Sequence, residues 1–364
     1  MKIVHVVDSM EVGGAETLVS QMCHLQREQG HVPSVFAVAT LGPLGESLRA
    51  EGFTVQHNVG RHLPDSVRNF FHIFKKLQPD VVHLHNQTPT IYASMAARMA
   101  GVPSIVATRH NLAAPPLPMI AELKYAIAAR FCDWIVGICD ATAENLRNIH
   151  AAPARKITRV YNGAAPLARV EQPQRASGSP FTLVFVGRLV EVKNHRLLLE
   201  AFRLALSSMP RLRLWMVGDG SERNALENLA CKLGISAQVT FWGQQLDVAP
   251  YFSAADAFIM SSKSEGLPIS LLQAFSLGLP VIVTDVGGMA EVVRLANAGL
   301  TVPPTDPAEM ASAILRLASN GAEREKFSKN AEAAFRSRFS LGTMVDAYMG
   351  LYRNTPRVRR AERN

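Results

Sequence analysis

Short runs of β-forming residues alternate with longer helical patterns along most of this chain, and this alternation limits the folds that it can adopt. In the first part of the chain, the predicted strands are residues 2–7, 32–39, 53–58, 79–85, 104–108 and 134–138. After the first of them, apolar residues follow at helical spacing, and Gly30 is typical of a helix end. Strands separated by helices predict βαβ units and a mostly parallel sheet.

A second series of the same kind follows a break in the pattern. Residues 166–180 are rich in Pro, Gln, Ser, Gly and Arg, and we interpret them as a linker. The predicted strands after the linker are residues 181–187, 213–218, 239–243, 256–261 and 280–285. A chain of 364 residues exceeds the size that one hydrophobic core usually supports. We therefore predict two α/β, doubly wound, Rossmann-like domains in tandem, residues 1–165 and 181–338.

Charge and cysteine content exclude several classes of protein. The net charge is +8, but five Arg against one Glu in the tail, residues 353–364, supply half of it, and the rest is too diffuse to predict nucleic-acid binding. The four cysteines lack the close pairs of a zinc site or a disulfide framework, and we interpret all of them as reduced core residues: Cys23, Cys132, Cys139 and Cys231. Early acidic residues argue against a signal peptide, and no long uncharged apolar stretch occurs. We expect a soluble, cytoplasmic protein.

Residues just after a strand are the first candidates for a functional site, because ligands of open parallel sheets bind beyond the carboxyl ends of the strands. Gly13 and Gly14 follow the first strand, where glycine lets the backbone approach a ligand closely; a tight turn is the alternative interpretation. Arg188 follows a strand of the second series, and Lys193 comes five residues later. Two cations there are suited to holding a diphosphate, and two solvated surface charges are the alternative.

The segment with the sequence SEGLPISLLQAFSLG forms another predicted turn between a strand and a helix. Glu265 lies in the loop, Pro268 suits the first helical position, and Gly278 suits the end of the helix. Glu265 can accept hydrogen bonds from sugar hydroxyls, while Ser270 and Gln273, three residues apart, can reach a nucleotide from one helix face. A capped surface helix with an acidic loop is the alternative interpretation.

Two histidines, His83 and His85, flank Leu84 at the end of a predicted strand, so that both rings lie on one sheet face. A metal site would need further ligands, and none is spaced convincingly near them. His110, after the next strand, is the better candidate for touching a substrate, with a satisfied buried histidine as the alternative. No Asp-x-Asp occurs in the sequence, so the usual carboxylate pair for a divalent ion on a nucleotide sugar is missing. We expect no metal and no other cofactor.

Taken together in this order, the motifs resemble the family-4 retaining glycosyltransferases of the GT-B fold. They are GGAE, DVVHLH, ATRHN, YNGAA, VGRLVEVKNH, VGDG, FWGQ, SEGLP and GLPVIVTDVGG, and they cover nearly the whole chain. The resemblance implies two Rossmann-like domains with an interdomain cleft and a C-terminal helix, residues 339–352, that packs back on the first domain. It also implies transfer of a sugar from a nucleotide-diphosphate donor to an acceptor hydroxyl with retention, in polysaccharide or cell-envelope glycan synthesis.

The same resemblance assigns donor contacts to Gly14, His110, Arg188, Lys193, Glu265, Gly266 and Leu267. Within that set, Arg188 and Lys193 match the cations that grip the diphosphate. His110 and Glu265 match residues that contact the transferring sugar, and these four are the candidate catalytic residues. The family usually carries a second Glu that binds the ribose, where this chain has Gln273. The amide keeps an acceptor oxygen but has lost the charge.

For partners, the resemblance implies a nucleotide-sugar donor and a carbohydrate or lipid-linked acceptor, whose choice we place in the loop from His110 to Lys124. A further hypothesis is loose attachment to the cytoplasmic membrane face through the arginines of the tail and the apolar loop near Leu117; a solvated tail is the alternative. Two other functions stay open. A nucleotide-sugar epimerase would need a second carboxylate beside Glu265, and a catalytically silent nucleotide-sugar binder or assembly partner is favoured only by Gln273.

Overall fold

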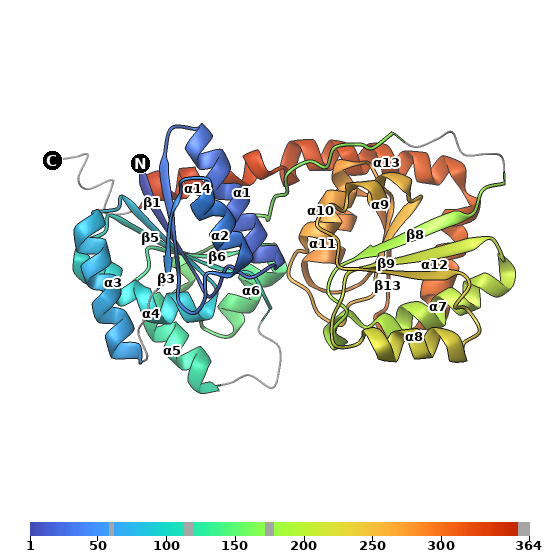
Figure 1. Cartoon of the computed structure of the whole chain (residues 1–364), viewed down its shortest axis with the longest axis horizontal. Coiled ribbons are helices and arrows are strands. Elements are labelled where there is room, and N and C mark those ends of the chain that lie inside the picture. The colour runs from blue at the N-terminus through green and yellow to red at the C-terminus, as the bar shows by residue number, and fades with distance from the viewer. Residues whose placement is uncertain (58–61, 113–118, 172–177, 356–364) are drawn as a thin grey trace. The chain divides into compact units, whose positions relative to one another are not determined.

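The computed structural model describes residues 1–57, 62–112, 119–171 and 178–355, and the chain divides into two compact units (Figure 1). The first unit is Met1–Gly163 together with the chain from Leu341 onward, and the second is Ala164–Ser340. The division falls two residues before the predicted end of the first domain. The residues that follow Gly163 already belong to the second unit. Among them, the backbone N–H of Leu167 donates to Ser276 Oγ at 3.2 Å. The described part of the predicted linker therefore packs on the second unit.

The first unit is a seven-stranded sheet with helices between its strands. The strand order is β3-β2-β1-β4-β5-β6-β7, and every pair is parallel. The strands are β1 (Lys2–Val7), β2 (Val32–Ala37), β3 (Thr54–His57), β4 (Val81–His85), β5 (Ser104–Arg109), β6 (Trp134–Gly137) and β7 (Ile157–Arg159). The helices are α1 (Gly14–Glu28), α2 (Gly42–Ala50), α3 (Leu63–Leu77), α4 (Gln87–Ala100), α5 (Met119–Ala129), α6 (Asp140–Asn148), the 3₁₀ turn η1 (Ala154–Lys156) and the C-terminal α14 (Leu341–Arg353).

The second unit repeats this plan with a six-stranded parallel sheet of order β10-β9-β8-β11-β12-β13. Its strands are β8 (Phe181–Val186), β9 (Leu212–Val217), β10 (Val239–Gly243), β11 (Ala257–Met260), β12 (Val281–Thr284) and β13 (Gly299–Val302). Its helices are η2 (Glu191–Lys193), α7 (His195–Ser208), α8 (Arg223–Lys232), α9 (Ala249–Ala254), α10 (Ile269–Ser276), α11 (Gly287–Ala296), α12 (Pro307–Ser319), α13 (Gly321–Ala334) and the π-helical turn η3 (Phe335–Phe339).

Sequence pattern predicted the central strands of both sheets and missed two edge strands. All eleven predicted strands are present. Those inside the sheets are easy to recognise, because they are runs of Val, Ile, Leu and Phe that are buried on both faces. The missed strands are β7 and β13, which have three and four residues and lie at the sheet edges. With one side unpaired, such strands need little apolar sequence of their own.

The C-terminal helix α14 packs on the first unit, as predicted. Its tyrosines Tyr348 and Tyr352 are buried, and their hydroxyls hydrogen-bond Thr108 on β5 at 2.9 Å and His83 on β4 at 2.7 Å. The helix therefore covers a sheet face that would otherwise expose polar side chains. In this way the last described residues of the chain complete the core built by the first 163.

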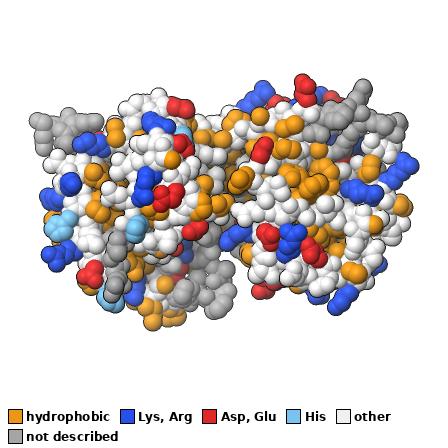
Figure 2. Space-filling view, viewed as in Figure 1, with side chains coloured by type: hydrophobic (Ala, Val, Ile, Leu, Met, Phe, Trp, Pro, Cys, Tyr) orange, Lys and Arg blue, Asp and Glu red, His pale blue; other side chains and the backbone are white. Residues whose placement is uncertain are grey.

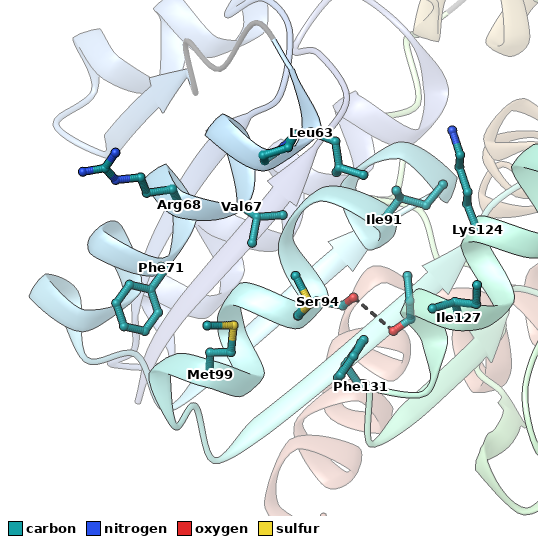
Figure 3. Close-up of a pocket in the computed structure, with 13 residues that line it drawn as sticks. Leu63, Val67, Arg68, Phe71, Ile91, Ser94, Met99, Lys124, Ile127 and Phe131 are labelled. Carbon is teal, nitrogen blue, oxygen red and sulfur yellow. Dashed lines mark hydrogen bonds between the residues drawn. The ribbon is translucent and has the colours of Figure 1, made fainter.

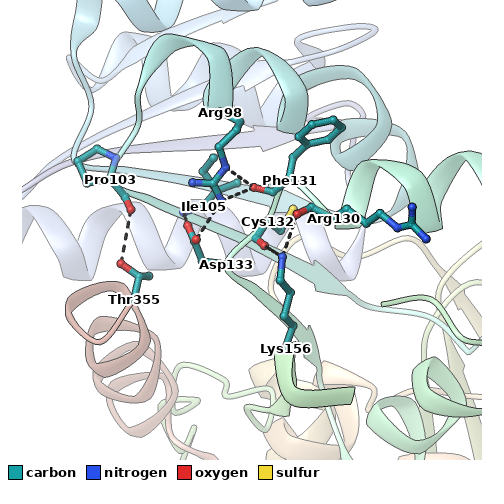
Figure 4. A network of polar contacts seen from close by, with 9 residues as sticks. All are labelled: Arg98, Pro103, Ile105, Arg130, Phe131, Cys132, Asp133, Lys156 and Thr355. Atoms are coloured by element: carbon teal, nitrogen blue, oxygen red, sulfur yellow. Dashed lines mark hydrogen bonds and ion pairs between the residues drawn. The ribbon is translucent and has the colours of Figure 1, made fainter. Parts of the chain in front are cut away.

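Polar contacts brace the connection between α5 and β6 (Figure 4). Lys156 Nζ donates to the carbonyl oxygens of Arg130 at 2.8 Å and Cys132 at 2.6 Å, and so satisfies groups at a helix end. Arg98 on α4 forms an ion pair with Asp133 at 2.9 Å. Both side chains of this pair are largely buried, so loss of either would leave an unpaired charge in the interior.

One prediction about the cysteines is wrong. Cys23, Cys132 and Cys139 are free and buried, but Cys231 is exposed. It lies on α8 beside Ala230, which is buried, and successive residues of a helix point about 100° apart. None of the helices in the described ranges combines the length and apolar character needed to cross a bilayer.

Candidate functional site

Each sheet has one point at which the strand order reverses, and the predicted site residues gather there. In the first unit the reversal lies between β1 and β4, and in the second it lies between β8 and β11. At such a point, neighbouring loops leave the carboxyl edge of the sheet in opposite directions and open a crevice for a ligand. The loop after β1 leads to Gly14, the first residue of α1, the connection after β8 carries Arg188 and Lys193, and the loop after β11 carries Glu265.

In the second unit, Arg188 presents a free cation at this edge. Its side chain is exposed, and it has no hydrogen-bond or ion-pair partner among the described residues. The backbone beside it is tightly packed. Gly187 has a φ of +158°, and a Cβ on Gly218 in the loop after β9 would lie 1.9 Å from the Gly187 carbonyl oxygen. Glycine at 218 therefore lets the two loops meet, and this contact fixes where Arg188 leaves the sheet.

Lys193 and Glu265 form an ion pair in which Lys193 Nζ donates to Glu265 Oε1. Ser262 Oγ donates to the same carboxylate oxygen at 3.0 Å. The two charged side chains are only 14% and 15% exposed, so little solvent screens them. Lys193 ends the short turn η2, two residues before α7. Of the two predicted cations, one is thus neutralised by Glu265, and Arg188 supplies the net positive charge.

The loop after β11 leads directly into α10. Gly266 and Leu267 are buried. Pro268 is the N-cap residue, directly before the helix, whereas the sequence predicted it at the first helical position. Gly278 has a φ of +66° just after the end of the helix, as its position in the sequence suggested. Gln273 is half-buried on α10, and its side-chain amide has no hydrogen-bond partner among the described residues. The free amide of Gln273 is therefore available to a ligand, and the N-terminus of α10 favours an anion.

In the first unit, His110 follows β5 and is 8% exposed. Its backbone N–H donates to Asn86 Oδ1 at 2.9 Å. Asn86 itself has φ 71° and ψ −170°, a conformation that only glycine adopts without strain. Such strain is typical of functional sites. Gly14, the first residue of α1, is exposed at that helix's N-terminus.

Sequence reasoning missed two residues that are linked to His110 through His85. His5 on β1 lies beside His83 in the sheet register, and Gln26 on α1 hydrogen-bonds His5. The signal was a histidine inside the apolar strand KIVHVV, which we treated only as a strand. Nitrogens of His5, His83 and His85 lie within 4.8 Å of one another, a spacing that a metal ion can bridge. All six ring nitrogens have hydrogen-bond partners, however, so the residues are fully satisfied as they stand.

These histidines are held neutral by burial. It lowers the pKa of His5 and of His110 to about 4, and those of His83 and His85 well below the ordinary range. For His83 and His85 the neighbouring histidines act in the same direction, because two adjacent imidazolium charges repel each other. At neutral pH, each ring therefore offers one N–H donor and one acceptor nitrogen.

A separate apolar cavity of about 570 Å³ lies between α3, α4 and α5 of the first unit (Figure 3). Leu63, Val67 and Phe71 line it from α3, with Ile91 on α4 and Ile127 on α5. A second cavity of about 690 Å³ shares Leu63, Ile91 and Lys124 with it. The acceptor loop predicted from His110 to Lys124 borders this region, although residues 113–118, with Leu117, lie outside the described part of the chain.

On the face seen in Figure 2, basic side chains are spread over both units and interspersed with acidic ones. Most of the basic tail, residues 356–364, lies outside the described residues.

Two family models match the chain. The model described as "Glycosyl transferases group 1" matches residues 169–334, and the model described as "Glycosyltransferase Family 4" matches residues 12–166. Between them they take in most of both units, including the loops that carry His110, Arg188 and Glu265.

Individual relatives are enzymes of glycan synthesis. The chain is 29% identical, over 62% of its own length, to the lipopolysaccharide core biosynthesis glycosyltransferase LpsE of Rhizobium meliloti, and the match spans 66% of that protein, just under two thirds. It is 25% identical, over 79% of its length and 78% of the relative, to an Escherichia coli UDP-Gal:alpha-D-GlcNAc-diphosphoundecaprenol alpha-1,3-galactosyltransferase. Anabaena HepE, solved with UDP and with UDP-glucose, superposes with TM-scores of 0.83 and 0.81 at 20% identity, over 96% of this chain and 99% and 98% of HepE. That likeness identifies the fold.

Proposed function

Because the chain belongs to the group 1 and family 4 glycosyltransferases of the GT-B fold, we propose that it transfers a sugar from a nucleotide-diphosphate donor to an acceptor hydroxyl with retention. The proposed setting is the synthesis of a polysaccharide or cell-envelope glycan, as the names of its relatives suggest. The observation that carries the proposal is the unpartnered Arg188 beside the Lys193–Glu265 pair, at the point where the second sheet reverses its order.

Arg188 and Lys193 would hold the diphosphate of the donor. When the bond to the sugar breaks, negative charge grows on the diphosphate, so cations fixed beside it stabilise the transition state more than the ground state. Lys193 can donate three hydrogen bonds, and its ion pair with Glu265 uses one of them. In this proposal no protein base is needed, since a leaving-group oxygen can take the acceptor proton.

The remaining site residues would position the sugar and the nucleotide. Glu265 would accept hydrogen bonds from sugar hydroxyls, and the backbone N–H groups of Gly266 and Leu267, in the loop that leads into α10, would face the phosphate. The Gln273 amide takes the place of the usual carboxylate at the ribose. Gly14 and His110 would complete the donor contacts from the first unit. We also propose that the reaction needs no divalent metal, because the Arg188 guanidinium and the Lys193 ammonium would meet the phosphates in its place.

The experiment that tests this proposal has two stages. A panel of nucleotide sugars is screened for thermal stabilisation, because a ligand that binds only the folded state raises the melting temperature. The donor found is then incubated with and without an extract of candidate acceptors. Release of nucleoside diphosphate only with the extract supports the transferase. Binding without release would favour the silent binder, and conversion of the sugar without release would favour the epimerase.

On the acceptor side, we propose that the first unit rests on an anionic membrane through α4 and α5. Of the large hydrophobic side chains that are exposed in the described residues, half are on these two helices: Met95, Met99, Met119, Ile120, Leu123 and Ile127. Isolated exposed apolar residues are common, but a contiguous group marks an interaction surface. The residues that line the cavity include two cations, Arg68 and Lys124. The attraction of each basic residue to an anionic lipid surface contributes about 1 kcal/mol to the binding free energy.

Vesicle flotation tests this surface. We expect the protein to float with vesicles of phosphatidylglycerol and not with phosphatidylcholine, and the double variant Ile120→Glu, Ile127→Glu to stay in solution. Leu246→Glu is the matched control, since Leu246 is 96% exposed in the second unit. A chain truncated after Thr355 separates the contribution of the tail. Wild-type protein that stays wholly in solution with both vesicle types would contradict the membrane proposal.

A further inference from the structure

Four histidines lie on one face of the first sheet, in the interior of the unit. His5 is on β1, His83 and His85 are on β4, and His110 directly follows β5. All four are at least 92% buried. Residues of α1 and α14 cover this face. Gln26 on α1 hydrogen-bonds His5, and on α14 the hydroxyls of Tyr348 and Tyr352 hydrogen-bond Thr108 and His83. A histidine cluster at this depth is rare unless each ring has fixed partners, so the partners of each nitrogen are informative.

Three of these rings form a single line of hydrogen bonds that starts at an amide. Gln26 Oε1 lies 2.8 Å from His5 Nε2, His5 Nδ1 lies 3.0 Å from His85 Nε2, and His85 Nδ1 lies 3.2 Å from His110 Nε2. We call Gln26, His5 and His85 the relay. His83 stands apart from this line: its two nitrogens bond Tyr352 and Thr108, both at 2.7 Å.

The direction of every bond in the relay follows from its first member. An amide oxygen can only accept, so His5 Nε2 carries the proton and His5 Nδ1 is an acceptor. His85 Nε2 must then donate, which leaves His85 Nδ1 as an acceptor, and His110 Nε2 must donate to it. We infer that the relay holds His110 as the neutral Nε2–H tautomer and presents its Nδ1 as a hydrogen-bond acceptor.

The tautomer of His110 decides what a ligand can offer to this ring. Nε2 is bonded to His85, so Nδ1 is the ring nitrogen that has no partner among the described residues. If His110 contacts the transferring sugar, an inference that rests on the proposed function, the partner of Nδ1 must be a donor. The relay would thus select a sugar that offers a hydroxyl at this position over one that offers a carboxylate, which cannot donate when it is ionised. Gln26, His5 and His85 are positioning residues, because they act on the substrate only through His110.

The tautomer is measured directly, without substrate, by two-bond ¹⁵N–¹H correlation on protein labelled in its histidines. The His110 signal is assigned by its absence in His110→Ala. In the wild type we expect protonation at Nε2 alone. In Gln26→Met, which keeps the length of the side chain, His5 Nε2–H would lose its acceptor. A buried donor without a partner is costly, so we expect both tautomers of His110 to appear.

Two further variants serve as a control and as a second test. Tyr348→Phe removes a hydroxyl from the same buried layer, at the Thr108 end of the other network, and should leave the His110 tautomer unchanged. His85→Phe breaks the relay in the middle and should mix the tautomers even if Gln26→Met does not fold. A wild-type His110 protonated at Nδ1 would overturn the inference, and so would a single Nε2–H form in either relay variant.

Binding of UDP and of UDP-glucose then separates this inference from the proposed function. If Nδ1 accepts from the sugar, Gln26→Met should weaken UDP-glucose about three- to tenfold, the value of one neutral hydrogen bond, and leave UDP unchanged. Equal affinity of wild type and Gln26→Met for UDP-glucose would remove the relay's role in sugar binding. If the wild type binds neither probe while the tautomers behave as expected, the choice of donor fails and the relay stands.

Discussion

Acid should destabilise the first unit well before it reaches the ordinary carboxylate range, because of the buried histidines. Burial lowers the pKa of His5 and of His110 from 6.5 to about 4, so the folded state favours their neutral forms. The stability that they contribute is complete above pH 6.5, where the unfolded chain is also neutral. It is lost as the pH falls from 6.5 toward 4, because the unfolded chain then binds protons that the folded chain does not.

The magnitude follows from these two pKa values. At pH 5.5 each of the two histidines removes about 1.4 kcal/mol from the free energy of unfolding, or about 3 kcal/mol together. His83 and His85 act in the same direction, since their pKa values are lowered as well. Set against a typical stability of about 5–15 kcal/mol, this is a large fraction. The second unit has one comparable histidine, His195, whose pKa burial lowers to about 3.

Hydrogen exchange followed by mass spectrometry resolves the two units in one experiment. Between pH 7.5 and 5.5, after correction for the intrinsic rates, peptides of β1 and β4 should lose about twice as much free energy of opening as peptides of β8, or more. His5→Gln should reduce the loss in the first unit by about 1 kcal/mol. His72→Gln, at an exposed position of α3, is the control and should not change it. A loss below about 0.5 kcal/mol in β1 and β4 would refute the reasoning.

Three further predictions concern the proposed donor site. Arg188→Ala and Lys193→Ala should each lower the rate more than tenfold with the fold intact, since a charge-assisted hydrogen bond is worth about 1.5–3 kcal/mol. Full activity in both variants would show that neither side chain is needed to hold the diphosphate. Chelation should leave turnover unchanged, and activity that is abolished by chelator and restored by magnesium or manganese would contradict the metal-free site. Gln273→Glu should lower turnover or leave it within about threefold, because a carboxylate there would strand the partner of the amide N–H₂ and add negative charge near the diphosphate. A tenfold rise in donor affinity and turnover would instead identify Gln273 as a defect.

Much of the fold could be predicted from the sequence, because local pattern carries that information. Runs such as KIVHVV and FTLVFVG, which are short and rich in β-forming residues, predict strands buried on both faces, and the helices between them predict parallel pairing. The loops that follow these strands lie at one edge of the sheet in any parallel arrangement. For that reason the positions of Gly14, Arg188 and Glu265 at the carboxyl edges could be predicted without coordinates.

What the sequence left open were contacts between residues far apart in the chain. Lys193 and Glu265 were predicted as separate ligand contacts, and only the folded second unit shows that they pair with each other. The signal from His5 could not be interpreted, because a histidine in an apolar strand is informative only when its neighbours are known. The relay needs α1, β1 and β4 in register, and its histidines are neutral because the whole unit excludes water from them. The sequence determines which side chains are present and what chemistry each can perform. Hydrogen-bond partners and pKa values depend on tertiary packing, because packing sets both the distances between groups and their exposure to solvent.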